Sequence, residues 1–374
     1  KKQDAYAVTV EHDMTLVGFA AFLDPPKEGI HSVLEALKQN GISVVVMTGD
    51  NQYVTQKVAH DVGLRADNIL TGNEVDTTDD AALAYQAENG AIFARMSPEQ
   101  KNRVILALKA RGHVVGYIGD GINDAPSLHT ADVGISVMNG VEVAKDAAKV
   151  ILLEKDLAVL NDGVNEGRRS FANIMKYIIM GTSSNFGNMF SMAGASLFLP
   201  FLPMLPTQIL LNNLLYDISQ ISIPGDNVDP ALLRQPKRWQ IGFIRQFMMI
   251  IGPISSIYDF LTFGILLWVF HASTNAPLFH TGWFVESLVT QTLVVLVIRT
   301  AANPLKSRPS LALLISVLAI VTIAAVLPYT VVGRLLQFTP LPLSLLGALA
   351  FLAVTYLLLV QGVKSWFYRR HALL

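Results

Sequence analysis

Two carboxylates lie on either side of a glycine turn in the first third of the chain. Asp120 and Asp124 flank Gly121, and the Asn123 amide lies between them. The apolar run 113–118 before them is typical of a buried strand, and open α/β sheets bind ligands at the carboxyl ends of their strands. Oxygen ligands of this kind suit Mg²⁺ at a phosphoryl group. The alternative is a glycine-rich turn that leads into a capped helix without chemistry of its own.

The end of a second predicted strand and one lysine also carry groups that suit the binding of a phosphoryl group. The apolar run 42–47 is followed by Thr48-Gly49-Asp50, which brings a hydroxyl and a carboxylate to the end of a predicted strand. Lys101 lies in the first turn of a predicted helix, so its ammonium can point back at a phosphate. The alternative for Lys101 is a solvated surface lysine.

The elements that must position these residues are strands and helices in alternation. We expect strands at 16–23, 42–47, 91–94, 113–118, 133–137 and 150–153, with helices at 29–39, 53–62, 98–111 and 125–130. Alternation with short connections predicts a doubly wound, mainly parallel sheet. The stretch 71–80, rich in Thr and Asp, is predicted to be an irregular surface loop without a chemical role.

The rest of the chain has the composition of a membrane protein. Hydrophobic residues make up 52% of the chain, and most charged side chains precede position 169. A soluble domain is seldom that apolar. We expect six membrane spans at about 171–199, 206–224, 245–270, 283–301, 310–329 and 341–363, each near or above the ~20 apolar residues that a bilayer requires. The chain has no cysteine, which excludes disulfides and thiolate metal sites.

A long helix is expected to connect the two parts. The segment 156–177 begins among charged residues and continues into the first span without a break. This continuity predicts rigid coupling between the soluble part and the membrane part. Basic residues gather after the second, fourth and sixth spans, which places both ends of the chain in the cytoplasm. These residues are Arg234, Lys237, Arg238, Arg245, Arg299, Lys306, Arg308, Lys364, Arg369 and Arg370.

Polar side chains interrupt the first two predicted spans. Asn185 and Asn188 are three residues apart, so they share a helix face and are expected to face the interior of a helical bundle. Asn213 and Asp217 are one turn apart in the second span. An intramembrane carboxylate is costly and indicates a functional site by default. The alternative is a set of interhelical hydrogen bonds that serve packing alone.

Four further titratable residues lie in or near the later spans. Asp259 and Glu286 are candidates for the ion path, although Asp259 can serve as a structural partner of another helix and Glu286 is expected to be shallow enough to meet headgroup water. His271 and His280 flank an external loop. We interpret them as interfacial, because Mg²⁺ prefers oxygen ligands to imidazole.

These residues carry a resemblance to a known family. Thr48-Gly49-Asp50, Lys101 and 119–124 are similar to three motifs of the haloacid dehalogenase superfamily, and the longer strings 48–51 and 119–126 resemble its P-type ATPase branch. The earlier string Asp24-Pro25-Pro26-Lys27 also matches that branch. The string 183–188 resembles the fifth membrane helix of P-type cation pumps, and 213–217 resembles the sixth. The strings 199–206, 216–220 and 226–229 are similar to bacterial magnesium-importing members.

The resemblance implies a role for each candidate residue. Asp120 would hold a catalytic Mg²⁺ with support from Asn123 and Asp124. Thr48, in one loop with Gly49 and Asp50, would hydrogen-bond the phosphoryl group that ATP supplies, and Lys101 would neutralise its charge. Asn185, Asn188, Asn213 and Asp217 would bind the transported ion. An amide at 188, where calcium pumps have a carboxylate, suits a Mg²⁺ ion that keeps part of its water.

The resemblance also implies an architecture. We expect a remnant of a nucleotide-binding domain at 1–15, a haloacid dehalogenase-like (Rossmann-like) α/β domain at 16–165, and an all-α transmembrane bundle of six helices at 166–374. The chain contains no Asp-Lys-Thr-Gly string, which carries the phosphorylated aspartate of the family. We therefore expect the C-terminal half of a pump, inactive alone.

The expected partners follow from that architecture. They are magnesium as cargo, ATP through the preceding half of the pump, that N-terminal half itself, and the lipid bilayer of a bacterial inner membrane, with no nucleic acid. Two alternatives remain: a P-type pump for another divalent cation such as Ca²⁺ or Mn²⁺, and a phosphatase domain of the same superfamily fused to a membrane scaffold.

Overall fold

The computed structural model describes residues 14–19, 26–27, 29–154, 156–234 and 236–370. It divides into two compact units, of which the first ends at Ala158 and the second contains 159–374 together with 39–41. Half of the predicted strand 16–23 and half of the string at 24–27 lie outside the described residues, as does most of the predicted segment 1–15. Residues 14–19 form neither helix nor strand.

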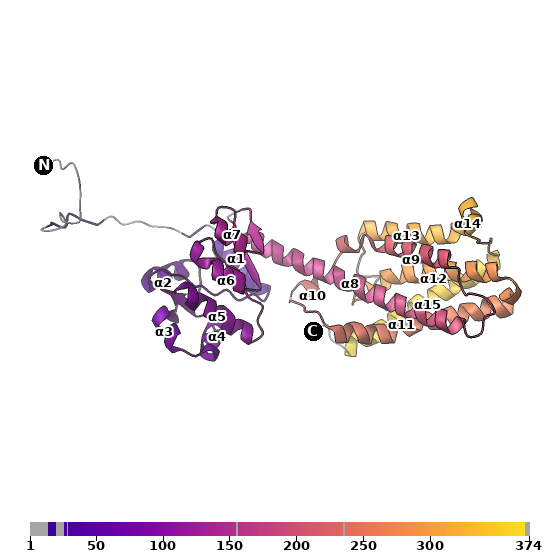
Figure 1. The fold of residues 1–374 in the computed structure, drawn as a ribbon, viewed down its shortest axis with the longest axis horizontal. Helices are drawn as coiled ribbons and strands as arrows, with labels where there is room; N and C mark the ends of the chain where they lie inside the picture. Colours follow the sequence, from indigo (N-terminus) through magenta and orange to yellow (C-terminus); the bar gives the residue numbers. More distant parts are fainter. Residues whose placement is uncertain (1–13, 20–25, 28, 155, 235, 371–374) are drawn as a thin grey trace. The chain divides into compact units, whose positions relative to one another are not determined.

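The first unit alternates short strands and helices (Figure 1). Its strands are β1 Ile69–Thr71, β2 Ile92–Ala94, β3 Gly116–Ile118, β4 Val133–Val137 and β5 Val150–Leu152. Its helices are α1 Ile30–Gln39, α2 Gln52–Asp61, α3 Gly72–Thr77, α4 Asp80–Glu88, α5 Pro98–Ala110, α6 Ala125–Thr130 and α7 Glu142–Ala147. The predicted α/β alternation is therefore confirmed for most elements.

The strands of the described residues pair in parallel, as predicted, but they form two separate sheets. β1 pairs with β2, and β3, β4 and β5 form a second sheet in that order. Among the described residues, the predicted strand 42–47 pairs only at its end, where Met47 forms an isolated bridge with Phe93. The Phe93 N–H donates to Val46 O, and the Thr48 N–H donates to Phe93 O, both at 2.9 Å. This pairing brings Thr48 to the carboxyl end of β2.

The helix α5 packs against the cores of both sheets. Val104 is buried among residues of the first core, which includes Phe93. Its neighbour Ile105 is buried in the second core with Tyr117 and Leu128. Because α5 joins the two cores, the start of this helix has a defined place beside the end of β3.

The prediction of an irregular loop at 71–80 is wrong. Thr71 ends β1, and α3 begins at the next residue, where the Glu74 carboxylate accepts a hydrogen bond from the Thr71 N–H at 2.7 Å. Asp79 then caps α4 by accepting from the Ala82 N–H at 2.9 Å. Thr and Asp favour helix N-caps as well as loops, and here they cap helices.

The second unit consists of helices, of which the long ones run side by side (Figure 1). They are α8 Leu157–Ala195, α9 Pro206–Gln220, α10 Pro230–Leu233, α11 Ile241–Gly264, α12 Ala276–Ile298, α13 Leu311–Val326, α14 Val331–Leu335 and α15 Leu343–Arg370. α12 contacts α9, α11, α13 and α15, so it forms the centre of this unit. The long helix predicted from 156 onward is confirmed, because α8 is unbroken from Leu157 to Ala195.

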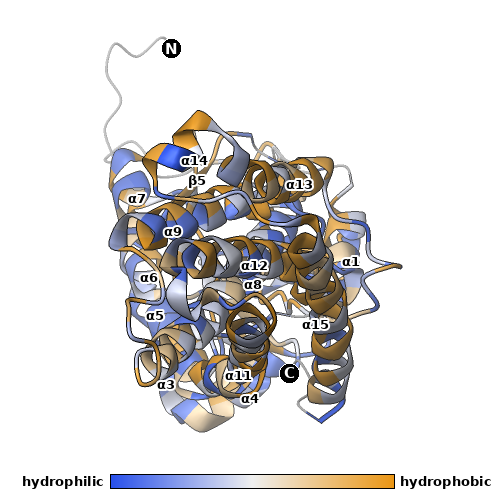
Figure 2. Ribbon diagram, turned by 90° about the vertical axis from the view of Figure 1, so that its right-hand side faces the viewer, coloured by the Kyte–Doolittle hydropathy of each residue, from blue (hydrophilic) through white to orange (hydrophobic). Residues whose placement is uncertain are grey.

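Four helices of the described residues are long and apolar enough to cross a membrane. They are Ile241–Val269, Ala276–Ile298, Leu311–Tyr329 and Leu343–Arg370, and they correspond to the third to sixth predicted spans. Figure 2 shows α13 and α15 coloured mostly as hydrophobic. α9 has 15 residues, which at 1.5 Å per residue is shorter than the ~30 Å hydrocarbon core of a bilayer.

One buried carboxylate joins several of these helices. Asp226, in the segment after α9, has a fully buried side chain, and its Oδ2 accepts hydrogen bonds from Lys176 Nζ of α8 and from Arg299 Nε at the end of α12, both at 2.8 Å. Its Oδ1 accepts from the Ser310 N–H at 2.9 Å. Asp226 thereby connects α8 to the ends of α12 and α13.

Candidate functional site

The position of Lys101 follows from the way α5 begins. Ser97 caps the helix, because its Oγ accepts from the Gln100 N–H at 3.3 Å. The Gln100 side chain in turn accepts from the Ser97 N–H at 2.9 Å. This reciprocal capping box fixes the first turn of α5, where Lys101 lies.

The position of Asp124 follows from the turn after β3. A short 3₁₀ helix, Ile122–Asp124, connects the turn to α6. The Gly121 N–H donates to Asp124 Oδ2 at 3.2 Å. A Cβ atom at Gly119 would lie 2.5 Å from Asp124 Cβ, so the close approach of backbone and carboxylate requires glycine at 119.

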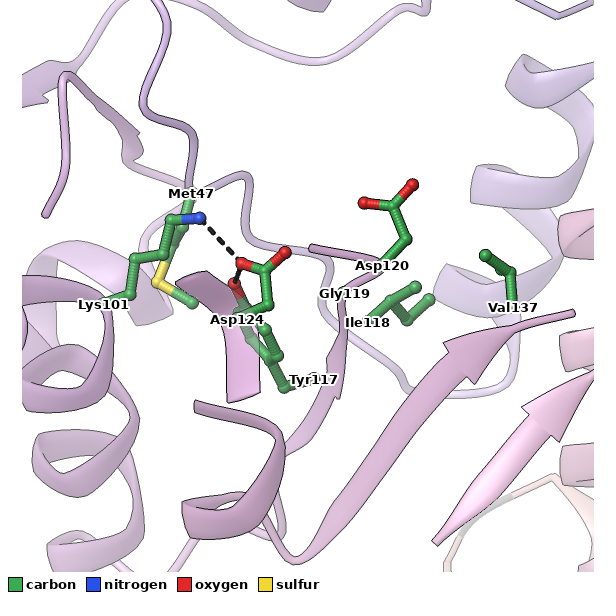
Figure 3. Close-up of a pocket in the computed structure, with 8 residues that line it drawn as sticks. All are labelled: Met47, Lys101, Tyr117, Ile118, Gly119, Asp120, Asp124 and Val137. Atoms are coloured by element: carbon green, nitrogen blue, oxygen red, sulfur yellow. Dashed lines mark hydrogen bonds and ion pairs between the residues drawn. The ribbon is translucent and has the colours of Figure 1, made fainter. Parts of the chain in front are cut away.

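These elements enclose a pocket of about 310 Å³ (Figure 3). It is lined by Met47, Lys101, Tyr117, Ile118, Gly119, Asp120, Asp124 and Val137. In Figure 3 the Lys101 ammonium and the Tyr117 hydroxyl both point at the Asp124 carboxylate. Lys101 Nζ lies 3.0 Å from Asp124 Oδ1, and the Tyr117 hydroxyl donates to the same oxygen at 2.6 Å. The pocket therefore holds one carboxylate fixed by two donors.

The neighbours of Asp124 keep it ionised. Burial alone would raise the pKa of this carboxyl, but hydrogen bonds from Tyr117 and Lys101 outweigh burial and lower the pKa below its ordinary value. Burial, reinforced by the Asp124 carboxylate, raises the pKa of Tyr117. At neutral pH the tyrosine is therefore a neutral hydroxyl that donates to a carboxylate.

Asp120 differs from Asp124 in its environment. Its side chain is exposed, and in Figure 3 its carboxylate extends away from the other labelled residues without a dashed line to any of them. Two carboxylates, one fixed and one free, fit the donor set that Mg²⁺ takes when waters and substrate phosphate oxygens complete its octahedron. Within the part of the chain that the structure describes, no group of three or more His, Cys, Asp or Glu side chains offers a more complete metal site.

The Thr48 loop lies outside the pocket lining. Thr48 Oγ1 donates to Asp50 Oδ2 at 2.9 Å, and the Asp50 N–H donates to Thr48 Oγ1 at 3.1 Å. Met47 lines the pocket, whereas Thr48, Gly49 and Asp50 do not. Asn123 is exposed and also outside the lining. The structure thus brings together Lys101, Asp120 and Asp124 and leaves the other sequence candidates beside them.

Sequence reasoning missed Tyr117. It lies in the apolar run that ends at Ile118, where it reads as one more buried side chain of a strand. The signal that could have found it is its hydroxyl, because a buried Tyr needs a hydrogen-bond partner and this one lies three residues before Asp120.

The candidate ion ligands of the helical unit differ in how far the neighbouring helices bury them. Asn188 is partly buried, and its Oδ1 accepts from Gln291 Nε2 of α12 at 2.9 Å. Asn185 is exposed in this chain, so the helices that the structure describes cover Asn188 and not Asn185. The helix α11 covers α8 on another side, because a Cβ at Gly187 would lie 2.9 Å from Gly252 O.

Asn213 and Asp217 are also exposed. The buried polar face of α9 instead consists of Gln208, Asn212, Tyr216, Ser219 and Gln220. The helical spacing correctly puts Asn213 and Asp217 on one face, but the neighbouring helices of this chain cover the other one.

Three of the remaining candidates are buried. Asp259 accepts hydrogen bonds from Ser191 of α8 and Trp283 of α12, so its interpretation as a structural partner is confirmed. The expectation that Glu286 is shallow is wrong, because its side chain is buried in the centre of the unit. His280 is buried and bonds Leu202 O at 2.7 Å, whereas His271 is exposed.

Comparison with known proteins identifies both units. Residues 1–132 match haloacid dehalogenase-like hydrolases, and residues 201–366 match the C-terminus of cation transporting ATPases. The chain is 48% identical over 373 residues to the magnesium-transporting ATPase, P-type 1, of Escherichia coli strain K12, an alignment that covers 99% of this chain and 42% of that protein. This chain belongs to the P-type ATPase family.

Other members of the family are similar to different degrees. The P-type ATPase chain is 49% identical over 364 residues to a magnesium-transporting ATPase, P-type 1, of Salmonella typhimurium strain 14028s, covering 96% of this chain and 40% of the relative. A calcium-transporting ATPase of Listeria monocytogenes is 36% identical over 231 residues, covering 61% and 26%. The chain thus spans about two fifths of the length of the magnesium-transporting relatives.

Family membership explains the two kinds of structure in one chain. A P-type ATPase combines a haloacid dehalogenase-like domain with a helical membrane region, and this chain has both, with four candidate spans among the described residues. It is a membrane protein. P-type ATPases use ATP and Mg²⁺ in general, in agreement with a pocket that presents two carboxylates and a lysine.

Proposed function

We propose that this P-type ATPase chain takes part in ATP-driven magnesium transport across a bacterial inner membrane. The observation that carries the proposal is the pocket in which Lys101, Asp120 and Asp124 meet at the carboxyl end of β3. Phosphoryl transfer needs charge stabilisation and positioning more than covalent chemistry. A cation, a fixed carboxylate and a free carboxylate supply those requirements.

The residues of the pocket would divide this work. Asp120 and Asp124 would hold Mg²⁺, which supplies charge neutralisation at the phosphoryl oxygens. Lys101 fixes Asp124 and presents positive charge to the same pocket. Thr48, in the loop with Gly49 and Asp50, would hydrogen-bond the phosphoryl group once its hydroxyl turns from Asp50. Asn123 would support Asp120 and Asp124.

The transported ion would bind at Asn185, Asn188, Asn213 and Asp217. Three of these four side chains, Asn185, Asn213 and Asp217, are exposed on the helical unit. Contact of an exposed carboxylate and exposed amides with lipid would be unfavourable in free energy. We infer that another part of the same pump, its N-terminal half, covers this face and completes the ion site.

The proposed topology extends the four candidate spans to six. The apolar part of α8 and the helix α9 would supply the first two, within a membrane domain at 166–374. Lys and Arg after the second, fourth and sixth spans support a cytoplasmic position of both ends of this chain. The α/β domain at 16–165 would then lie on the side where ATP is present.

Metal uptake tests the proposal. The full-length gene is expressed in a bacterial strain that lacks magnesium transporters, and growth at low magnesium and uptake of magnesium are measured. Asp217→Asn is expected to abolish uptake while the protein remains in the membrane at the wild-type level. Ile218→Val, next along the same helix, is the matched control and retains uptake. Full uptake by Asp217→Asn would contradict the ion site, and uptake of Ca²⁺ or Mn²⁺ instead of magnesium would overturn the cargo.

A further inference from the structure

Two acidic residues that the proposed ion site does not use lie together inside the helical unit. Asp259 of α11 is 3% exposed and Glu286 of α12 is 2% exposed. Each carboxyl interacts electrostatically with the other. Because an isolated buried carboxylate is costly, a pair of them needs an explanation.

Asp259 is surrounded by hydrogen-bond donors. Ser191 Oγ of α8 donates to its Oδ2 at 2.5 Å, and Trp283 Nε1 of α12 donates to its Oδ1 at 2.7 Å. The indole nitrogen is a donor only, so the oxygen it contacts must act as an acceptor. Donors on both oxygens stabilise the ionised form, and Asp259 is therefore the member of the pair that carries the negative charge.

Glu286 has the opposite environment. Its Oε2 is buried and has no hydrogen-bond partner among the described residues. The hydroxyl of Thr290, one turn further along α12, donates to the main-chain oxygen of Glu286 at 2.9 Å. Glu286 and Trp283 are three residues apart, so α12 turns both side chains toward Asp259. A carboxyl oxygen that is buried without a donor destabilises the ionised form and favours the protonated one.

The groups around the pair offer no compensating positive charge. The titratable side chain that interacts with the pair from a neighbouring element is Tyr356 of α15, and Tyr356 in turn interacts with Tyr216 of α9 and Tyr258 of α11. Ser191 of α8 is uncharged. Of the described residues, no Lys, Arg or His contributes to the charge balance of either carboxyl. Two adjacent buried carboxylates without a cation cannot both be ionised, so the pair retains a proton.

We propose that Asp259 and Glu286 form a proton-binding site in the membrane bundle, with the proton on Glu286 and the negative charge on Asp259. A proton suits this site better than a divalent metal ion, because both oxygens of Asp259 already accept hydrogen bonds and the described residues provide no third acidic or imidazole ligand. Loss of the proton to water leaves two carboxylates, and its return restores the pair. The site is independent of the proposed magnesium ligands.

Infrared spectroscopy of the purified full-length protein tests this site. In a detergent without ester groups, the carbonyl stretch of a protonated carboxylic acid is resolved from carboxylate bands, and transfer to D₂O shifts it. The wild type is expected to retain such a band at pH 7, where exposed Asp and Glu, with ordinary pKa values of about 4, are ionised. Absence of the band from the wild type would overturn the proposal without any variant.

Two substitutions assign the band. Glu286→Gln is expected to remove it, whereas Glu166→Gln, which removes an exposed carboxylate paired with Arg169 on α8, leaves it unchanged. Asp259→Asn removes the neighbouring negative charge, so the band should disappear at a lower pH than in the wild type. If Glu286→Gln does not fold, the shift in the pH at which the band disappears in Asp259→Asn still decides the assignment. A carboxyl elsewhere in the protein would not change its titration when Asp259 is replaced.

Magnesium addition separates a proton site from a metal site. At fixed pH, millimolar Mg²⁺ is expected to leave the band at its wild-type intensity. Loss of the band on addition of Mg²⁺ would show that the metal replaces the proton and would overturn the assignment. A band that survives Glu286→Gln would overturn it too. Neither result depends on transport activity, so the outcome is separate from the test of magnesium uptake.

Discussion

Lys101 Nζ lies 3.0 Å from Asp124 Oδ1, although 23 residues separate them in the chain. The side chains are 13% and 15% exposed, so this ion pair is more strongly coupled than one on an open surface. It holds the Asp124 carboxylate in one orientation in the lining of a pocket whose other acidic group, Asp120, is exposed. The pair therefore prepares the site before any ligand arrives.

Loss of the lysine should affect both stability and catalysis. We expect Lys101→Gln to destabilise the first unit by about 1–3 kcal/mol, because the hydrogen-bonded partner of a half-buried carboxylate is removed, and to lower ATP hydrolysis of the full-length pump by at least about 100-fold. Thermal unfolding and ATPase assays measure the two effects. Lys57→Gln removes an exposed helical ion pair with Asp61 and should change neither. Wild-type ATP hydrolysis by Lys101→Gln would exclude a role in charge stabilisation.

Removal of the tyrosine hydroxyl should change the pH dependence of stability. Tyr117→Phe removes a donor to Asp124, whose pKa in the folded state is lowered from 3.8. A lowered pKa contributes stability that is present above 3.8 and is lost as the pH falls through the folded-state value. The variant should be less stable than the wild type by about 1 kcal/mol at pH 7.

The same difference should decrease as Asp124 becomes protonated in strong acid. Urea unfolding of both proteins at pH 7 and in a series of more acidic buffers measures it. A loss of stability that is equal at every pH would indicate a packing defect and not the loss of a bond to the carboxylate.

Two glycines on either side of Asp120 form a matched pair of test positions. A Cβ at Gly119 would lie 2.5 Å from Asp124 Cβ, whereas a Cβ at Gly121 would lie 3.5 Å from Asp124 Oδ2, an ordinary contact. Gly119→Ala should displace the carboxylate at a cost of about 1–3 kcal/mol and reduce ATP hydrolysis more strongly than Gly121→Ala. Equal activity of the two variants would contradict the geometry of the turn.

The buried carboxylate of Asp226 should be the most sensitive position in the helical unit. Burial alone would raise its pKa, but hydrogen bonds from Arg299 and Lys176 lower it below the ordinary value. Asp226→Asn leaves two buried cations without their anion and should cost about 3–5 kcal/mol. Thermal unfolding of the detergent-solubilised protein measures the loss.

A second substitution at the same site provides the control for this prediction. Lys176→Met in the Asp226→Asn background removes one of the unpaired cations and should restore part of the stability. Substitutions of two residues that form an ion pair do not have additive effects on the free energy of unfolding. A double variant that is less stable than Asp226→Asn would show that Lys176 contributes mainly through its packing.

Much of the fold was predictable because its signals are local. The bounds of α6 and β4 agree with the sequence prediction, since a proline in the first turn and an apolar run bounded by turn residues are sufficient to define them. The segment 71–80 was not predictable in this way. Thr71 and Asp79 suit loops and N-caps equally well, and the choice depends on hydrogen bonds to Glu74 and to the Ala82 N–H that composition does not reveal.

The sequence by itself determined which residues carry the chemistry and which of them share an element, because motif spacing and helical periodicity are properties of the chain. Only the tertiary structure decided that Tyr117 and Lys101 converge on Asp124, while Thr48 bonds Asp50 outside the pocket lining. Only the packing of helices decided that Asp217 is exposed. Periodicity gives the residues of a helix face, but which face is covered depends on neighbours that are distant in sequence.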